Sequence, residues 1–201
     1  MPTSKVVRLA NKATAEQLTS LISSEYELPS MKGRVQYLHA KSLDEGQRES
    51  IWSLFETNMY ELYKDSSFGW DPPRKKKELF HSFSRFVLVY QADSMNLLAF
   101  TMFRFEFDED EDIVYCYDLQ VSKAHQGLRL GRKLLNELTK LGKAFHLEKV
   151  ILTVLKTNVE AVAFYKAVGF VLDPTSPDHE GHIGEEEVAE VDYQILSRSV
   201  A

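Results

Sequence analysis

The residues best suited to chemistry lie in and just after one segment, residues 113–121. This segment is rich in β-branched and aromatic side chains, which predicts a strand. A glycine-bearing loop follows at 126–131 (Gln-Gly-Leu-Arg-Leu-Gly) and opens a cationic helix. The N–H groups and the dipole at the start of a helix attract phosphate. Because Asp118 lies on the strand just upstream, the pattern predicts a phosphate or pyrophosphate site with a carboxylate beside it.

Composition limits the classes of function that are open to the chain. It has 201 residues, 44% apolar and 27% charged, as is ordinary for one soluble globular domain. Its single cysteine, Cys116, excludes an internal disulfide and fits a reducing compartment. Cys-x-x-Cys and His-x-x-x-His spacings do not occur, so we expect no metal. The net charge of −6 disfavours direct nucleic-acid binding. No apolar run reaches membrane-spanning length, and the first residues lack a secretory signal, so we expect no membrane association.

Three charge runs stand out from this ordinary background. Residues 108–112 are five consecutive acids, residues 185–187 are three glutamates, and residues 74–77 are Arg-Lys-Lys-Lys. Such runs are usually solvated faces, and we interpret the last two in that way. The first run directly precedes the strand at 113–121, so it can rim the pocket and would suit a basic ligand.

Hydrophobic periodicity and turn residues predict the elements that must position these groups. Helices are expected at 14–22, from a capping box at 42–45 to about 63, at 72–79, 128–144 and 158–168, and strands at 34–40, 86–90, 97–107, 113–121, 149–155, 170–172 and 191–196. Residues 173–190 are expected to form a loop. Antiparallel strands followed by a strand–helix–strand crossover predict an α+β fold rather than a doubly wound nucleotide-binding fold. We expect an N-terminal helical extension (1–33) and one main domain (34–201).

Two motifs together resemble the GCN5-related N-acetyltransferase (GNAT) superfamily. The loop at 126–131 is similar to its acetyl-CoA loop, with Arg129 where the middle glycine is usual, and residues 158–170 are similar to its Asn…Ala…Phe-Tyr…Gly-Phe helix. The resemblance implies a mixed, mostly antiparallel sheet flanked by helices, and acetyl-CoA as the acetyl-donating cosubstrate. It assigns Leu119, Gln120 and Val121 to the pantetheine arm, Gly127, Leu128, Arg129, Leu130, Gly131 and Arg132 to the pyrophosphate, and Asn158 to the cofactor arm.

A closer resemblance covers most of the chain beyond about residue 40. Tyr-Cys-Tyr-Asp at 115–118 and Tyr-Gln-Ile-Leu-Ser-Arg at 193–198 are similar to the NatD family of N-terminal acetyltransferases, which is selective for the histones H-four and H-two-A. The resemblance implies acetylation of the α-amino group of histone tails that begin Ser-Gly-Arg-Gly. It also implies a monomer without an obligatory auxiliary subunit, resident in the nucleus and cytoplasm.

Aromatic and acidic residues are the expected contacts of such a tail. An arginine at its third position favours paired carboxylates, and Glu106 and Asp108 alternate onto one face of their strand. Aromatic walls would exclude a larger first residue. In the alternative interpretation, the two acids are solvated rim charges and the tyrosines of 115–117 form a core face. The resemblance assigns Tyr63, Phe68, Glu106, Asp108, Tyr115, Tyr117, Thr153, Thr175 and Tyr193 to the substrate, with Phe68 where close relatives tend to have Trp.

The expected reaction is direct attack of a neutral amine on the thioester. An α-amine has a pKa of about 7.7–8.0, against about 10.4 for lysine, so one carboxylate acting through water can suffice as the base. Asp118 is the first candidate and Glu106 the second. Tyr165 either protonates the departing thiolate, as the corresponding tyrosine does in many GNAT enzymes, or packs only, and Cys116 is interpreted as a buried, inert thiol. Two alternatives stay open: an acetyltransferase of lysine or small amines, and a non-catalytic module that binds basic peptides.

Overall fold

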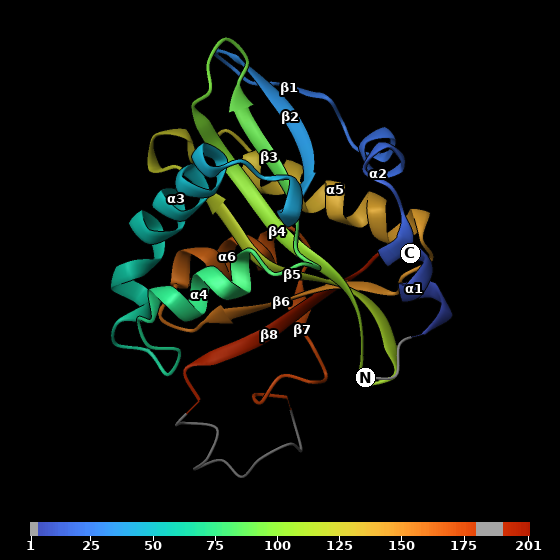
Figure 1. The fold of residues 1–201 in the computed structure, drawn as a ribbon. Coiled ribbons are helices and arrows are strands. Elements are labelled where there is room, and N and C mark those ends of the chain that lie inside the picture. Colours follow the sequence, from blue (N-terminus) through green and yellow to red (C-terminus); the bar gives the residue numbers. More distant parts are fainter. Residues whose placement is uncertain (1–3, 180–190) are drawn as a thin grey trace.

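One mixed sheet forms the centre of the molecule (Figure 1). The computed structural model describes residues 4–179 and 191–201, and within them the sheet has eight strands in the order β1-β2-β3-β4-β5-β6-β8-β7. All neighbouring strands are antiparallel except β5 and β6, which are parallel. The strands are β1 Glu25–Glu27, β2 Lys32–His39, β3 Arg85–Gln91, β4 Leu97–Asp108, β5 Glu111–Val121, β6 Lys149–Leu155, β7 Val171–Leu172 and β8 Tyr193–Ser199.

Helices cover both faces of this sheet, which confirms the predicted α+β class (Figure 1). The helices are α1 Lys5–Lys12, α2 Ala15–Leu21, α3 Glu45–Tyr63, α4 Pro72–Leu79, α5 Leu130–Ala144 and α6 Val159–Ala167, with short 3₁₀ turns η1 Ala40–Ser42 and η2 Lys123–His125. Helices α3 and α4 pack on one face, and α1, α2, α5 and α6 pack on the other. Strand β3 is buried from Arg85 to Tyr90 because apolar layers cover both of its faces.

The N-terminal helices pack into the core of the main sheet. Val7 and Leu18 are buried in the same cluster as Leu134 of α5. Asn11 donates a hydrogen bond from Nδ2 to the Phe105 carbonyl at 3.1 Å. The predicted division between residues 1–33 and 34–201 stays a prediction, but residues 4–33 share a hydrophobic core with β4 and α5.

The structure departs from the sequence-based expectations in several local features. Helix α3 is capped by Asp44, not by Ser42: the Asp44 carboxylate accepts from the Gln47 N–H at 2.8 Å, and the Gln47 side chain accepts from the Asp44 N–H at 3.1 Å. Helix α1 and strand β1 were not predicted, and β8 continues to Ser199. The acidic run at 185–187 and most of the expected loop at 173–190 lie outside the described residues.

Two local predictions agree with the structure. Strand β6 coincides with the predicted strand at 149–155, and α4 begins at Pro72 after Asp71, whose carboxylate accepts from the Arg74 N–H at 3.0 Å. Within the described ranges, no helix is long and apolar enough to cross a membrane. In the same ranges, no three His, Cys, Asp or Glu side chains gather as a set of metal ligands.

Candidate active site

A cavity opens where the two parallel strands separate. Strands β5 and β6 pair only from Ile113 to Tyr115 and from Lys149 to Ile151. Beyond these residues the strands diverge, and a cavity of about 950 Å³ lies between them, bounded also by α3, α6 and the loop before α5. This volume falls at the upper end of the range for small-molecule sites, about 300–1,000 Å³.

A β-bulge in β5 accompanies this divergence. Phe103 of β4 pairs with Cys116, but the next pair is Met102 with Asp118, so Tyr117 is an extra residue in β5. Bulges bend a strand and strengthen its twist. The extra residue also places Tyr117 and Asp118 on the α3/α4 face of the sheet, whereas Cys116 faces α5.

The loop before α5 has the geometry of an anion site. Gly127 and Arg129 adopt left-handed conformations, with φ of 79° and 63°, and α5 begins at the next residue, Leu130. Arg129 thus takes the backbone conformation that favours the expected glycine, at a cost of roughly 1–2 kcal/mol. Among the described residues no side chain caps α5, so its first N–H groups remain for a ligand. Arg129 and Arg132 add positive charge to the cavity wall.

Close packing of two helices brings this loop to the cavity. A Cβ atom on Gly131 would lie 2.9 Å from the end of the Phe164 ring of α6, so a larger residue here would require this ring to shift. Asn158 caps α6 by accepting a hydrogen bond from the Ala161 N–H at 3.3 Å, and it also lines the cavity. Both helices therefore begin at the cavity wall.

Comparison with known proteins identifies the family. Residues 56–170 match the model of the acetyltransferase (GNAT) family, which is more than half of the chain. The chain belongs to the acetyltransferase (GNAT) family. This membership supports acyltransferase activity with acetyl-CoA as the donor.

Individual relatives add detail to this assignment. A 72-residue stretch is 36% identical to N-alpha-acetyltransferase 40 of Saccharomyces cerevisiae and covers 32% of this chain but only 25% of that protein. A GNAT-family acetyltransferase of Staphylococcus aureus has a TM-score of 0.61 at 15% identity, over 83% of this chain and 99% of that one. Naa50 of Arabidopsis thaliana, solved with the bisubstrate analogue CoA-Ac-MVNAL, has a TM-score of 0.54 at 19% identity, over 82% of this chain and 98% of that one. At these identities the solved structures show the fold alone.

The cavity of this GNAT chain fits acetyl-CoA. The β5 edge that β6 leaves unpaired can pair with an extended arm, and the start of α5 with its two arginines suits the pyrophosphate. Asn58 of α3, which sequence reasoning did not assign, fixes this edge by donating to Gln120 Oε1 and to the Val121 carbonyl, both at 3.0 Å. Of the residues predicted for the cofactor, Leu119, Gln120, Val121, Gly127, Arg129, Leu130, Gly131, Arg132 and Asn158 line the cavity, whereas Leu128 packs against the core.

Asp118 is a buried carboxylate in the wall of the acetyltransferase cavity. Its side chain is 3% exposed, and Lys75 Nζ lies 3.0 Å from Oδ2. The Gln120 amide donates to Oδ1 at a long 3.4 Å. Burial raises the pKa of the Asp118 carboxyl, and the attraction of Lys75 only partly offsets this effect.

Sequence reasoning missed Lys75, because it interpreted residues 74–77 as a solvated charge run. The Lys75 side chain is only 13% exposed, is paired with Glu78, and has its Nζ 4.9 Å from the centroid of the Phe55 ring. A signal was available in the sequence. Lys75 lies four residues before the buried Leu79, so both share the inner face of α4.

A cluster of hydroxyl and acidic groups lies where β5 and β6 begin to separate. The rings of Tyr115 and Tyr117 are 4.5 Å apart. The Tyr115 hydroxyl bonds Thr153 Oγ1 at 2.6 Å, and the Tyr117 hydroxyl donates to Glu106 Oε1 at 3.0 Å. Burial raises the pKa of both tyrosines and of Glu106. The tyrosines therefore remain protonated donors at neutral pH.

Aromatic residues from the α3–α4 loop and β8 close one side of the cavity. The Phe68 ring lies 5.6 Å from both the Tyr63 and the Tyr193 rings. Ser67 fastens this contact by donating its N–H and hydroxyl to the Asp192 carboxylate at 2.7 and 2.6 Å. The α3–α4 loop and the start of β8 are far apart in the sequence but are thus in direct contact.

Tyr165 faces the same cavity from α6, on the opposite face of the sheet from Asp118. Burial raises its pKa well above the ordinary value, with further contributions from Cys116, Asp118 and Tyr63, so its hydroxyl stays protonated. Cys116 is also buried, and burial raises its pKa to about 12, so its thiol stays neutral. The cavity therefore brings together a carboxylate and a phenol.

Not every predicted site residue reaches this cavity. Tyr63, Phe68, Tyr117, Thr153, Asp118 and Tyr165 are part of its wall. Among the described residues, Glu106, Tyr115 and Tyr193 lie behind the wall and contact residues of it. Asp108 is exposed at the end of β4. Thr175 is turned to a separate cluster, where its hydroxyl donates to Asp173 Oδ1 at 2.7 Å.

Proposed function

We propose that this GNAT acetyltransferase transfers the acetyl group of acetyl-CoA to the α-amino group of histone tails that begin Ser-Gly-Arg-Gly. The observation that carries the proposal is the cluster of Tyr115, Tyr117, Thr153 and Glu106 beside the buried Asp118. Hydroxyl groups at this place can orient a peptide backbone, and an acid can read a cationic side chain. The stretch that is 36% identical to N-alpha-acetyltransferase 40 of Saccharomyces cerevisiae supports the same class of acceptor.

The reaction exchanges one bond at the acetyl carbonyl carbon. Acetyl-CoA supplies a thioester, whose C–S bond breaks as a C–N bond forms to the α-amine. Asp118 accepts one proton of the amine through water, and Tyr165 gives its proton to the departing sulfur. The proton on Asp118 then passes to Tyr165 through solvent, which restores both residues, so the net transfer is of one proton from the amine to the CoA thiol.

The ionisation states at the site suit an α-amine. With a pKa of about 7.7–8.0, roughly a tenth of such an amine is neutral at pH 7, against well under a thousandth for lysine. Burial raises the pKa of Asp118, which makes its carboxylate a stronger base than an exposed aspartate. Tyr165 remains protonated and can act as the acid.

Glu106 is the proposed partner of the arginine at the third position. The Tyr117 hydroxyl holds it at 3.0 Å, and Arg104 Nη1 lies 4.0 Å from the same oxygen. Arg104 already interacts with this carboxylate, so a second acid is needed for a strong arginine site. Asp108 lies two residues further along β4. The proposal includes a monomer without an obligatory auxiliary subunit, and residence in the nucleus and cytoplasm where histones are made and used.

A peptide assay tests the acceptor. The purified chain and acetyl-CoA are incubated with a Ser-Gly-Arg-Gly tail peptide and with the same peptide blocked at its N-terminus, and the products are read by mass spectrometry. We expect acetylation of the free α-amine only. Acetylation of lysine in the blocked peptide alone would overturn the proposal in favour of a lysine acetyltransferase.

Thermal unfolding with CoA tests whether the chain is an enzyme or a binding module. A ligand at a hundred times its Kd should stabilise the fold by about 2.7 kcal/mol. Absence of any shift would contradict the acetyl-CoA site and favour a module that only binds basic peptides.

A further inference from the structure

A buried lysine lies directly behind the proposed base. Lys75 extends from α4 to β5, and its Nζ lies 3.0 Å from Asp118 Oδ2. The side chains are 13% and 3% exposed, so both charges lie away from solvent. The centroids of the Phe55 and Tyr63 rings are 4.9 and 5.7 Å from the ammonium.

This environment determines the charge of both partners. A carboxyl buried without an opposite charge becomes neutral, since burial of an isolated charge costs several kcal/mol. Burial lowers the pKa of Lys75, but Asp118, Tyr63 and Glu78 raise it more, so the ammonium stays protonated. Lys75 is therefore a fixed cation rather than an alternative base. The charged and titratable groups that face the pair are Glu78 of α4, Tyr63 of α3, Cys116 of β5 and Tyr165 of α6.

The two carboxylate oxygens of Asp118 differ in their contacts. Oδ2 faces the ammonium, whereas Oδ1 receives only the long 3.4 Å hydrogen bond from Gln120. Glu78 holds Lys75 from the side of its own helix, so the ammonium is anchored independently of Asp118. Oδ1 is thus the oxygen left to accept a proton.

We propose that Lys75 is a positioning residue for acetyl transfer, which holds Asp118 by Oδ2 and keeps it ionised at neutral pH. The proposal rests on the proposed function only in that Asp118 takes the proton of the acceptor. It assigns a role in the reaction to a side chain of the basic run at 74–77, although Lys75 contacts neither substrate directly.

The test compares three variants in the full chain. Lys75→Met removes the charge and keeps the length of the side chain, and Lys75→Arg keeps the charge. Lys76→Met is the matched control, because the Lys76 ammonium lies 4.5 Å from the centroid of the Trp52 ring. For each variant, kcat and KM are measured against pH with acetyl-CoA and the tail peptide, and folding is checked by thermal unfolding.

Loss of the cation should raise the pKa of Asp118 and reduce the fraction of base. We expect Lys75→Met to lower kcat at pH 7 by about tenfold or more, with little change in the KM for acetyl-CoA. The acid limb of its pH profile should move up by about one unit or more, so activity recovers in part at alkaline pH. Lys75→Arg and Lys76→Met should keep the acid limb of the unchanged protein. A folded Lys75→Met protein with an unshifted acid limb would overturn the proposal.

Two further measurements separate this proposal from the proposed function. The ionisation of Asp118 is followed without any substrate, by carbon NMR of aspartate labelled in the side-chain carboxyl, with Asp118→Asn to assign the signal. If the chain fails to acetylate the tail peptide but Lys75→Met still shifts this titration, the acceptor is wrong and the lysine–aspartate coupling stands. In the background of Asp118→Asn, Lys75→Met should lower kcat no further, and an additional tenfold loss would contradict action through Asp118. If Lys75→Met does not fold, Lys75→Gln gives the same charge test with a side chain that still donates hydrogen bonds.

Discussion

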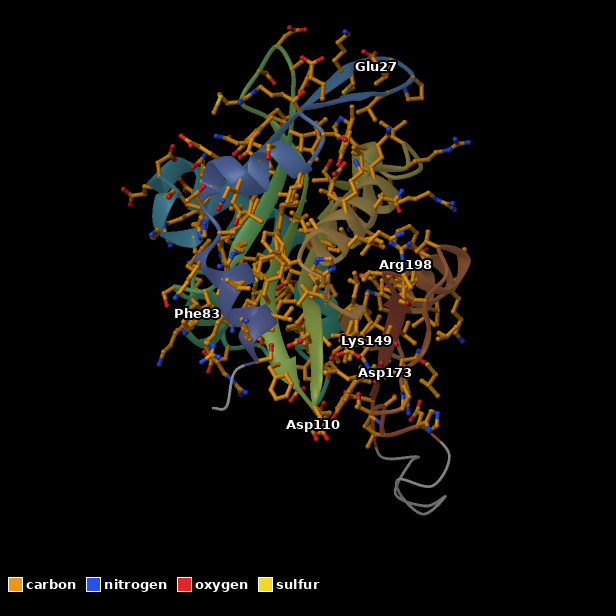
Figure 2. All side chains as sticks on the ribbon, turned by 90° about the vertical axis from the view of Figure 1, so that its right-hand side faces the viewer. Glu27, Phe83, Asp110, Lys149, Asp173 and Arg198 are labelled. Carbon is orange, nitrogen blue, oxygen red and sulfur yellow. The ribbon has the colours of Figure 1, made fainter. Side chains whose placement is uncertain are left out.

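Two buried lysine–aspartate pairs lie in the described part of this acetyltransferase, and the pKa of the aspartate is shifted in opposite directions in the two. Lys149 Nζ is 2.7 Å from Asp173 Oδ2, near the tip of the β4–β5 hairpin at Asp110 (Figure 2). Lys75 and Asp118 are 3.0 Å apart beside the proposed acetyl-CoA cavity. The residue types and distances are nearly the same.

Hydrogen bonds make the difference between the two pairs. Burial acts to raise the pKa of Asp173, but hydrogen bonds from Lys149, Ser197 and Thr175 lower it to about 2. Asp118 receives fewer such bonds, and its pKa is raised. A carboxylate that accepts many hydrogen bonds stabilises the fold. A carboxylate that accepts few hydrogen bonds, in the wall of a cavity, remains able to accept a proton.

Asp118→Asn should produce the largest effect on turnover. The amide cannot accept the proton of the amine, so kcat should fall by about 100- to 10,000-fold. Lys75 keeps Glu78 as a partner, so the variant should fold. Steady-state kinetics with the tail peptide and a thermal unfolding curve check both statements. Undiminished turnover would remove Asp118 as the base and leave Glu106 as the candidate.

Asp173→Asn should have the reverse outcome, a loss of stability with turnover retained. We expect the free energy of unfolding to fall by about 2–3 kcal/mol, somewhat less than for a wholly unpaired buried charge, because Lys149 still has Glu111. Denaturant unfolding measures this loss. A kcat that falls as steeply as in Asp118→Asn would show that the contrast between the two pairs is wrong.

The same pair should give stability a dependence on pH. The folded pKa of Asp173, about 2, lies below the usual value of about 3.9, so its contribution is complete above about pH 4 and is lost as pH falls through 2. Unfolding curves of the unchanged protein and of Asp173→Asn should therefore converge on acidification. Parallel curves down to pH 2 would contradict the assignment of a strongly paired carboxylate.

The smallest effect is expected from the acids that lie outside the cavity wall. Glu106→Gln with Asp108→Asn should raise the KM for an arginine-bearing tail by about five- to tenfold, because a charge-assisted hydrogen bond is lost. The KM for a tail with alanine at the third position should change much less. Equal losses for the two peptides would mean that these carboxylates do not read the arginine.

The sequence predicted those parts of the molecule whose signals are local. The predicted strands at 97–107 and 113–121 and the cap at Asp71 depend on near neighbours, and the structure agrees with them. Helix α1 escaped prediction because only Val7 and Ala10 of its eight residues are buried, and β1 has only three residues.

The environment of the proposed base could not be predicted in the same way. Lys75 is buried by rings of α3 and by a carboxylate of β5, which join it only through the tertiary fold. The bulge at Tyr117 depends on pairing with β4 and leaves no pattern in the sequence of β5 itself. Sequence reasoning therefore identified Asp118 but not the cation that determines its charge.

The extra residue in β5 has a consequence for how the strand could be shortened. If Tyr117 were deleted, β5 would alternate regularly, with Cys116 toward α5 and Asp118 still opposite Met102 on the α4 face. Lys75 would therefore keep its partner. The loss would fall on the peptide side of the site, because the deleted ring lies 4.5 Å from Tyr115 and its hydroxyl donates to Glu106. Removal of one position would thus separate the two halves of the site, sparing the base and its counterion and abolishing the contact to the acid of β4.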